Sequence, residues 1–160
     1  MLNSRSKGRG QTALEVLFLM GVIFTALVLI VPEYLNGDTD TAILMHVRNA
    51  ADNACTYLNT GVVIEDNVNA PLNGIIEAAN YSSLQCQVSG VGITSSTDTQ
   101  VSLKVVVVYH SNAVSSSDVK DAVENFITET LKVRGGFSES GGNLHYGKKS
   151  VSITVEAVRG

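Results

Sequence analysis

The pattern of hydrophobic residues begins with a stretch that is apolar on every side. From Val16 to Val31, sixteen residues follow one another without a charge, and twelve of them are Leu, Ile, Phe or Val. A helix that is hydrophobic all round must be buried in lipid or in protein. At roughly −0.3 to −0.6 kcal/mol for each of these side chains, insertion into a bilayer gains about 4 to 7 kcal/mol. The pattern therefore predicts a membrane-inserted helix.

This apolar stretch is too short to cross a membrane by itself. Sixteen helical residues cover roughly 24 Å, whereas Gln11 to Val31 would cover roughly 31 Å, which matches a hydrocarbon core of about 30 Å. Spanning the membrane therefore brings Glu15 into it. A carboxylate there costs up to about 3 kcal/mol, so we expect Glu15 to have a functional role and a specific partner.

The pattern changes after Pro32, which removes one helical hydrogen bond and predicts a kink or a local melting of the helix. Residues 36–38 (Asn-Gly-Asp) are a turn signal, and Asp38, Thr39 and Asp40 all suit a helix N-cap, so we expect the helix to weaken there. It then resumes as an amphipathic helix, for which Gly61 is a suitable C-terminal cap. The apolar stripe of this half consists of Leu44, Val47, Ala51, Ala54 and Leu58.

The remaining hundred residues predict a small α+β domain. Residues 84–93, 101–110 and 151–158 alternate or run apolar as strands, and the simplest arrangement for them is an antiparallel sheet. A short helix is expected after Pro71. A helical stripe between 119 and 131 predicts a second helix that covers one sheet face, with Ser116 or Ser117 as its cap. The Gly-rich residues 134–149 predict an exposed loop or hairpin.

Composition and charge fit one membrane-linked segment followed by one small domain. The chain has 160 residues, of which 44% are hydrophobic and 16% charged. Three of its 11 basic residues lie in the first ten, which leaves 8 basic against 15 acidic residues after position 10. Scattered basic residues in an acidic chain do not provide the clustered positive charge that nucleic-acid binding requires. The basic first ten residues predict a cytoplasmic N-terminus and an outward-facing C-terminal domain.

The N-terminal sequence RGQTALEVLFLMGVIFTALVLIVPEY resembles an archaeal type IV pilin with a class III signal peptide. The resemblance rests on the basic leader, the Gly-Gln junction, a Glu four residues later, the uninterrupted apolar run and Pro32. The Thr-Ala-Leu tripeptide before Glu15 departs from the pattern only in variable positions. An ordinary secretory signal would end in an A-x-A type site, and no such site follows the apolar run.

This resemblance implies how the protein is processed and assembled. A prepilin peptidase would cut between Gly10 and Gln11, so that residues 1–10 are a leader and residues 11–60 form the mature N-terminal helix. Its apolar half, 11–32, would be stored in the membrane and its amphipathic half, 38–60, would lead into a β-rich outer domain, 61–160. An assembly ATPase and a membrane platform would then extract the subunit into a homopolymeric filament on the cell surface, which serves adhesion.

Glu15 has two interpretations. Cleavage would create a new α-amino group on Gln11, and Glu15 of one subunit can pair with this amine of the next, which fixes the axial register of the stack. Alternatively, Glu15 lies at the membrane interface and is favoured by the helix dipole by about 0.3 to 1 kcal/mol. Gly21, Thr25 and Ala26 either allow close approach of neighbouring helices or are small residues that face lipid.

Other candidate chemistry is sparse. Cys55 and Cys86, the only cysteines, are a disulfide candidate in an outward-facing domain, with two free buried thiols as the alternative. Asn80 begins the single N-x-[ST] sequon and is a candidate for N-glycosylation. Asp38 and Asp40 lack the further ligands of a calcium loop. We find no ligand spacing among the three histidines and no catalytic motif, and we expect no metal, no cofactor and no enzymatic activity.

Two other functions stay open from the sequence. The chain could be a minor pilin that primes or tips the filament, which its abundance in isolated filaments would distinguish. It could also be a single-pass membrane protein that displays a binding domain or an enzyme outside the cell. An uncleaved N-terminus and the absence of a polymer would indicate this third possibility.

Overall fold

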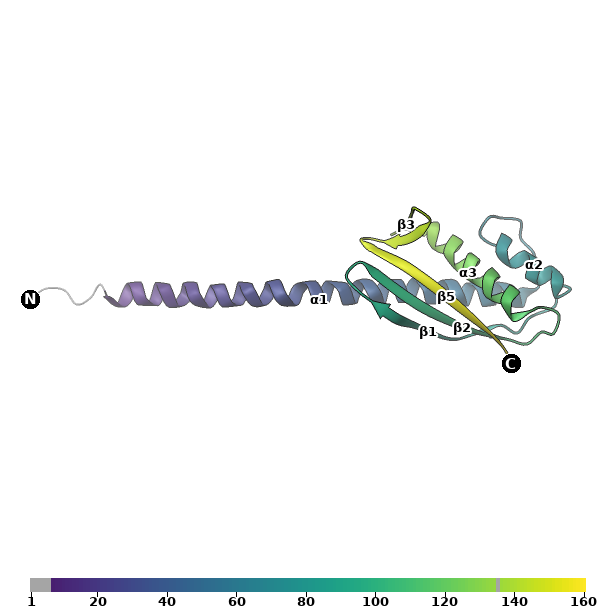
Figure 1. The fold of residues 1–160 in the computed structure, drawn as a ribbon, viewed down its shortest axis with the longest axis horizontal. Coiled ribbons are helices and arrows are strands. Elements are labelled where there is room, and N and C mark those ends of the chain that lie inside the picture. The colour runs from purple at the N-terminus through teal and green to yellow at the C-terminus, as the bar shows by residue number, and fades with distance from the viewer. Residues whose placement is uncertain (1–6, 135) are drawn as a thin grey trace, which may run out of the picture. The chain divides into compact units, whose positions relative to one another are not determined.

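The computed structural model describes the backbone of residues 7–134 and 136–160, and the side chains of these residues except for 7–12 and 31–37. The elements, in chain order, are α1 (Lys7–Thr60), α2 (Ala70–Ala78), β1 (Gln87–Ser96), β2 (Gln100–Tyr109), α3 (Ser116–Lys132), β3 (Phe137–Ser140), β4 (Asn143–Tyr146) and β5 (Lys149–Arg159) (Figure 1). The chain divides into two compact units, of which the first ends at Thr39 and the second is Asp40–Gly160.

Helix α1 continues through the turn signal at 36–38, where the sequence predicted that it would weaken. That prediction is wrong, and Asp38, Thr39 and Asp40 are interior helical residues and no N-caps. A glycine inside a helix costs only about 1 kcal/mol relative to alanine, which is too little to end a helix that continues on both sides. Pro32 also lies within α1, which continues through it, so the predicted local melting is wrong and a kink stays a prediction.

The C-terminal end of α1 agrees with the sequence. The helix ends at Thr60, and Gly61 follows with a φ of 64°, the left-handed conformation that glycine adopts at little cost. Four of the five predicted stripe residues, from Val47 to Leu58, are buried, and Leu44 is half-buried. The stripe therefore faces the core as predicted.

The sheet has five strands in the order β1-β2-β5-β4-β3. All neighbouring pairs are antiparallel except β2 and β5, which are parallel over their whole length, from Gln100 opposite Ser150 to Tyr109 opposite Arg159. The predicted all-antiparallel sheet is therefore wrong at its centre. The reason is the connection: α3 returns the chain to the start of β2, as in a βαβ crossover, and the β3-β4 hairpin then precedes β5.

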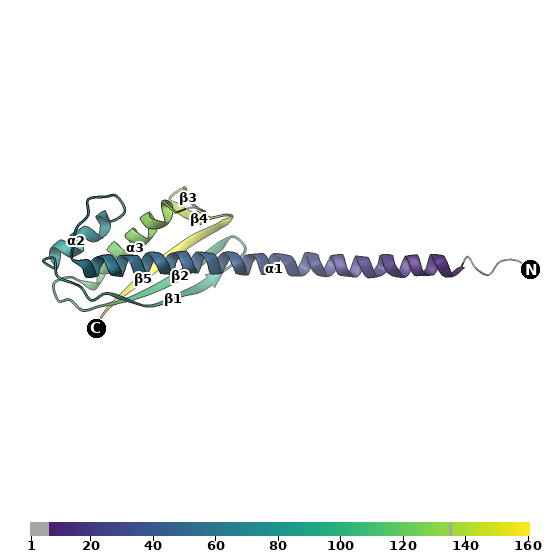
Figure 2. The ribbon, with the colours of Figure 1, turned by 180° about the vertical axis from the view of Figure 1, so that it is seen from behind.

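One face of the sheet is covered by the part of α1 from Asp40 to Thr60, as the two opposite views in Figures 1 and 2 show. On β2 every second side chain is buried, as expected for a sheet with one covered face. Helix α3 packs against β5, β3 and α2. The main buried residues that α1, β2 and α3 contribute are Ile43, Val47, Ala51, Ala54, Leu58, Val101, Leu103, Val105, Val107, Tyr109, Val119, Val123, Ile127 and Leu131.

The predictions for the hairpin and for α2 are confirmed, and the one for the cap of α3 is wrong. Residues 137–146 form the β3-β4 hairpin within the Gly-rich stretch, and α2 begins beside Pro71, both as expected. The N-cap of α3 is Ser115, whose hydroxyl accepts a hydrogen bond from the backbone N–H of Asp118 at 3.1 Å, so Ser116 and Ser117 are not the cap. The fold class is α+β, as predicted: a long apolar N-terminal helix is followed by a sheet domain with helices.

Candidate functional site

The apolar part of α1 exposes its side chains on every side. Ala13–Ile30 has a mean hydropathy of 2.6, and it is the one segment among the described residues that is long and apolar enough to cross a membrane. None of it is buried within the molecule. Leu17 and Phe18 are 75% and 72% exposed, and Leu29, on the last turn, is 69% exposed. Such a helix requires a cover of lipid or protein, since burial of this surface is strongly favourable.

One face of this helix contains a notch of small residues. The face consists of Phe18, Gly21, Val22, Thr25, Ala26 and Leu29. A methyl group added at Gly21 would find no atom within 4 Å, so the notch is open. The Thr25 hydroxyl donates to the carbonyl of Gly21 at 2.8 Å, so this polar group is satisfied within the helix itself. The face is apolar apart from this hydroxyl and has an open notch, which suits close contact with another helix.

Glu15 is the single charged residue of Ala13–Ile30, and its side chain is exposed. It forms no salt bridge with the residues that the structure describes. The partner that the sequence predicts for this carboxylate is therefore not found among the described residues. The side chains of Gln11 and Pro32 lie outside the described ones, and nothing in the described part of the chain tests the junction of Gly10 and Gln11, so the cleavage site and the kink stay predictions.

A buried ion pair fastens α1 to the sheet domain at Asp40. The Lys149 ammonium, at the start of β5, donates to Asp40 Oδ1 at 2.7 Å, and the Ser96 hydroxyl, at the end of β1, donates to Oδ2. The side chains of Lys149 and Asp40 are only 4% and 15% exposed. The sequence suggested a cap for Asp40, and no local signal links it to a lysine 109 positions away.

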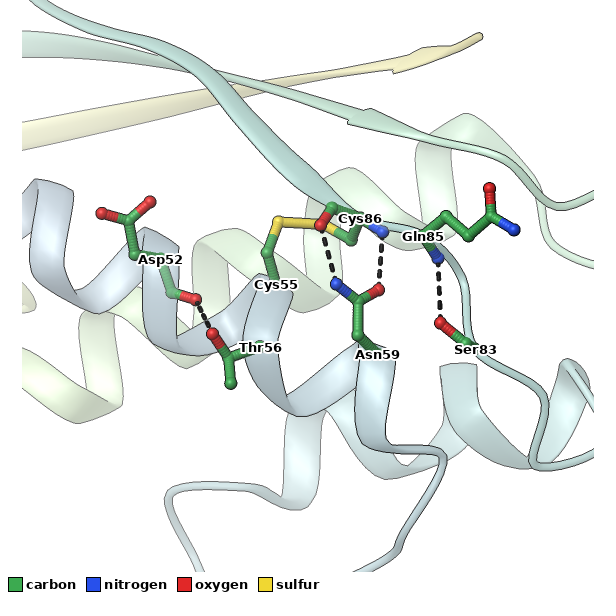
Figure 3. The surroundings of a disulfide bond; sticks show 7 residues. All are labelled: Asp52, Cys55, Thr56, Asn59, Ser83, Gln85 and Cys86. Carbon is green, nitrogen blue, oxygen red and sulfur yellow. Dashed lines mark hydrogen bonds between the residues drawn. A yellow bond between two sulfur atoms is a disulfide. The ribbon is translucent and has the colours of Figure 1, made fainter.

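A second link between α1 and the sheet domain is the disulfide bond between Cys55 and Cys86, which confirms the sequence prediction (Figure 3). It joins α1 to the residue that precedes β1. One turn further along α1, Asn59 accepts a hydrogen bond from the Cys86 N–H at 2.6 Å and donates one to the Cys86 carbonyl at 2.9 Å. This amide pairs with both backbone groups of Cys86, as a neighbouring strand would. Together these contacts hold α1 against the sheet near its C-terminal end.

The histidines have structural surroundings. His46 packs its ring edge-on against Phe137, with 5.6 Å between ring centroids, and lies 5.9 Å from the ring of Tyr146. This aromatic cluster attaches the β3-β4 hairpin to α1. His110 lies against Gly160 at the end of the chain. Among the described residues no group of three or more His, Cys, Asp or Glu side chains is placed to hold a metal ion.

The sequon at Asn80 lies on an exposed turn after α2. Asn80 and Tyr81 both adopt left-handed backbone conformations, with φ of 52° and 57°, and Asn80, Tyr81 and Ser82 are all exposed. The Asn80 side chain is therefore accessible to a transferase, and glycosylation stays a prediction.

The loop after α1 is held rigidly by a network that the sequence did not predict. The Tyr57 hydroxyl donates to Asn73 Oδ1 and accepts from the Ile64 N–H, each at 2.7 Å. Asn73 Nδ2 donates to the Ile64 carbonyl at 3.0 Å. Both backbone groups of Ile64 are thus satisfied, while its side chain is 51% exposed. The three residues lie 7 to 16 positions apart without a regular spacing, so no periodic pattern could have revealed this network.

Comparisons with known proteins found no counterpart for this chain. No protein-family description matches it, and no curated protein and no solved structure matches it either.

Proposed function

We propose that this protein is a structural filament subunit, which loses residues 1–10 and polymerises through its apolar N-terminal helix into an extracellular, type IV pilus-like fibre. The observation that carries the proposal is the composition of α1. Its part from Ala13 to Ile30 is apolar and entirely exposed, while its part from Ile43 to Leu58 is buried against a folded, disulfide-bonded domain. A helix of this kind can move from lipid into a bundle of its own copies and keep its apolar surface covered.

Glu15 supports polymerisation in preference to simple anchoring. In a helix that only anchors a domain, a carboxylate two residues inside the membrane span is unfavourable, because the charge is buried without a partner. In a stack of processed subunits, this carboxylate can pair with the α-amino group of Gln11 in a neighbouring copy. The pair removes two uncompensated buried charges and selects one axial register. The N-terminal resemblance to type IV pilins points to the same arrangement and to a prepilin peptidase as the processing partner.

The outer domain supports a location outside the cell. Its disulfide bond is of the kind that persists in oxidising surroundings. The basic leader predicts that the N-terminus is cytoplasmic and that the domain is exported. The role we propose for the assembled filament is attachment of the cell to surfaces.

The first test is N-terminal sequencing and intact mass of the protein in a sheared cell-surface fraction. We expect this fraction to contain polymers in which the chain begins at Gln11. A chain that begins at Met1 and stays monomeric in the membrane would instead indicate a single-pass anchored domain. A processed chain that is rare in the filaments would indicate a minor subunit.

The second test neutralises the carboxylate. Glu15→Gln keeps the size of the side chain, leaves the amine of the neighbouring copy unpaired and should lower the amount of filament by at least about 100-fold, since breaking a buried pair costs about 3 to 5 kcal/mol. The variant should still insert into membranes. Glu156→Gln, which neutralises an exposed carboxylate on β5, is the matched control and should assemble normally. Normal filaments from the Glu15 variant would refute the register pairing.

A further inference from the structure

The domain Asp40–Gly160 has two opposite ends along α1, and contacts define both. The Asp40 end consists of the first turns of α1 in this domain and of the hairpin, because Lys149 bonds Asp40 and the ring of Phe137 packs on His46. The Gly61 end consists of the loop after α1 and of α2, because Tyr57 bonds Ile64. The 20 residues between Asp40 and Gly61 separate these ends by roughly 30 Å of helix.

The most exposed apolar side chains of this domain are found at these ends. Five large apolar residues between 40 and 160 are more than half exposed in the described chain. Val62, Ile64 and Tyr81 lie at the Gly61 end, at 57%, 51% and 59% exposure, and Met45 and Val133 lie at the Asp40 end, at 61% and 71%. Exposed apolar groups that are gathered in this way are typical of interaction sites.

The Gly61 end is a rigid surface. Tyr57 and Asn73 hydrogen-bond both backbone groups of Ile64. The Gly61 backbone lies directly against the carbonyl of Tyr81, where an added Cβ would come within 2.3 Å of the oxygen. The apolar side chains of this end are thus presented in one fixed arrangement, which lowers the entropy cost of binding a partner.

The two ends differ in charge. Residues 61–86 contain Glu65, Asp66 and Glu77 and no Lys or Arg. At the Asp40 end Lys149 pairs with Asp40, Lys132 pairs with both Glu129 and Glu139, and Asp98 has an interaction of its own.

Two basic residues at the Asp40 end are left over after these pairings. Arg134 and Lys148 form no salt bridge within the described part of the chain. An acidic, apolar end and an end with two available cations and two exposed apolar groups are complementary.

We propose that the Gly61 end of one copy binds the Asp40 end of the next copy, in a head-to-tail contact between the outer domains. The inference rests on the proposed filament and adds a second interface to that of the apolar helices. A contact between two different patches of identical subunits does not close on itself as a two-fold dimer does, so it can continue indefinitely along a filament. The partner that both ends fit is therefore a second copy of this chain.

The first experiment is cross-linking within filaments of the full chain. Ile64→Cys and Val133→Cys are introduced together, and sheared filaments are treated with a short bismaleimide, while Cys55 and Cys86 stay protected in their disulfide. The head-to-tail contact predicts a ladder of dimers, trimers and longer products on denaturing gels. Each single-cysteine variant should give monomers only. Dimers from a single-cysteine variant, or no products from the double variant in intact filaments, would overturn the inference.

The second experiment reverses charges and needs no new cysteine. Lys148→Glu opposes the acidic end of the neighbouring copy with a like charge and should lower the filament yield by about tenfold. Lys104→Glu makes the same change in net charge in the middle of β2 and should leave the yield unchanged. Adding Glu65→Lys to Lys148→Glu should restore most of the yield.

The outcomes separate this inference from the proposed function. Equal yields for Lys148→Glu and the native chain, or no recovery in the double variant, would refute the head-to-tail contact while filaments still form. The absence of filaments from the native chain would refute the proposed function itself. In each case the amount of subunit stored in the membrane shows whether a variant is folded and retained.

Discussion

At Gly61 both the backbone conformation and the close packing against Tyr81 require a glycine. Its φ is 64°, and a Cβ at this position would lie 2.3 Å from the carbonyl oxygen of Tyr81, a backbone atom that cannot move aside cheaply. Gly141, in the β3-β4 turn, has nearly the same φ, 58°, but a Cβ there would meet nothing within 4 Å. The two glycines therefore separate the cost of a left-handed alanine from the cost of a collision.

We predict that Gly61→Ala destabilises the domain far more than Gly141→Ala does. The control should lose about 1 to 2 kcal/mol, the usual cost of a left-handed conformation. Gly61→Ala adds a clash with Tyr81 that forces the loop or the turn to move, and should lose about 3 to 5 kcal/mol in all. Thermal unfolding of the full chain in detergent would measure both. Similar losses for the two variants would show that the contact with Tyr81 is easily relieved.

Asp66 makes the Gly61 end sensitive to acid. Its two carboxylate oxygens accept from the backbone N–H and the side-chain amide of Asn69, at 2.6 and 2.7 Å. These hydrogen bonds hold the pKa of Asp66 below its ordinary value of 3.8. Because the pKa is lower in the folded state, the stabilisation is fully present above the unfolded value and is lost as the pH falls through the lowered pKa.

The expected result is that Asp66→Asn reduces the drop in thermal stability between about pH 6 and about pH 2, because one source of acid sensitivity is removed. The variant should be somewhat less stable than the native chain at the higher pH. Asp121→Asn, which neutralises a carboxylate near the start of α3, serves as the control. An unchanged acid response in the Asp66 variant would contradict the assignment.

Among the elements, α1, β1 and β5 depend on one buried ion pair. Lys149–Asp40 and Lys104–Glu156 have nearly equal lengths, 2.7 and 2.6 Å, and both lysines belong to strands of the sheet. Their environments differ, because the Lys149 side chain is 4% exposed and the Lys104 side chain 49%. The free energy of each pair should follow its burial.

Lys149→Met should therefore destabilise the domain by about 3 to 5 kcal/mol, because it leaves the Asp40 carboxylate buried with only the Ser96 hydroxyl as partner. Lys104→Met should cost about 0 to 1 kcal/mol. The combination of Lys149→Met with Asp40→Leu should recover much of the loss, since no unpaired charge is then buried. Urea unfolding in detergent measures all three, and equal losses for the two lysine variants would contradict the role of burial.

The disulfide joins the same helix to the start of the sheet. Cys55 and Cys86 are 31 positions apart, and closing a loop of this length stabilises a fold by about 4 kcal/mol in the chain-entropy model. Replacing both residues by Ser should lower the free energy of unfolding by about that amount, while Asn59 continues to hold Cys86's backbone position. A loss below about 1 kcal/mol would mean that the Asn59 contacts and the core already fix α1.

At the scale of the whole molecule, the buried core belongs to the second of the two units. Among the residues whose side chains the structure describes, all buried core residues lie at or after Ile43, so Asp40–Gly160 has a core of its own. We predict that a fragment of residues 40–160 with its disulfide formed is folded, soluble without detergent and monomeric. Circular dichroism and analytical ultracentrifugation check this. A fragment that aggregates or stays unfolded would show that the preceding residues contribute to the fold.

The sequence alone determined those features that depend on local pattern. The apolar run, the amphipathic stripe of α1, the strands, the α3 stripe and the Gly61 cap all follow from periodicity or from conformational preference, and they were predictable for that reason. The Cys55–Cys86 bond was predictable because only one intramolecular pairing exists. The continuous helix through 36–38 was missed because a turn signal is a weak preference, which helical segments on both sides overrule.

Only the tertiary structure decided how distant residues meet. Nothing local distinguishes a parallel from an antiparallel neighbour for β2. The direction of β5 depends on the edge at which the chain enters it after α3 and the β3-β4 hairpin. Asp40 and Lys149 pair across 109 positions, and Tyr57, Asn73 and Ile64 form one network from three segments. Such contacts depend on the relative placement of whole elements, which is set by burial of the shared core and leaves no periodic trace in the sequence.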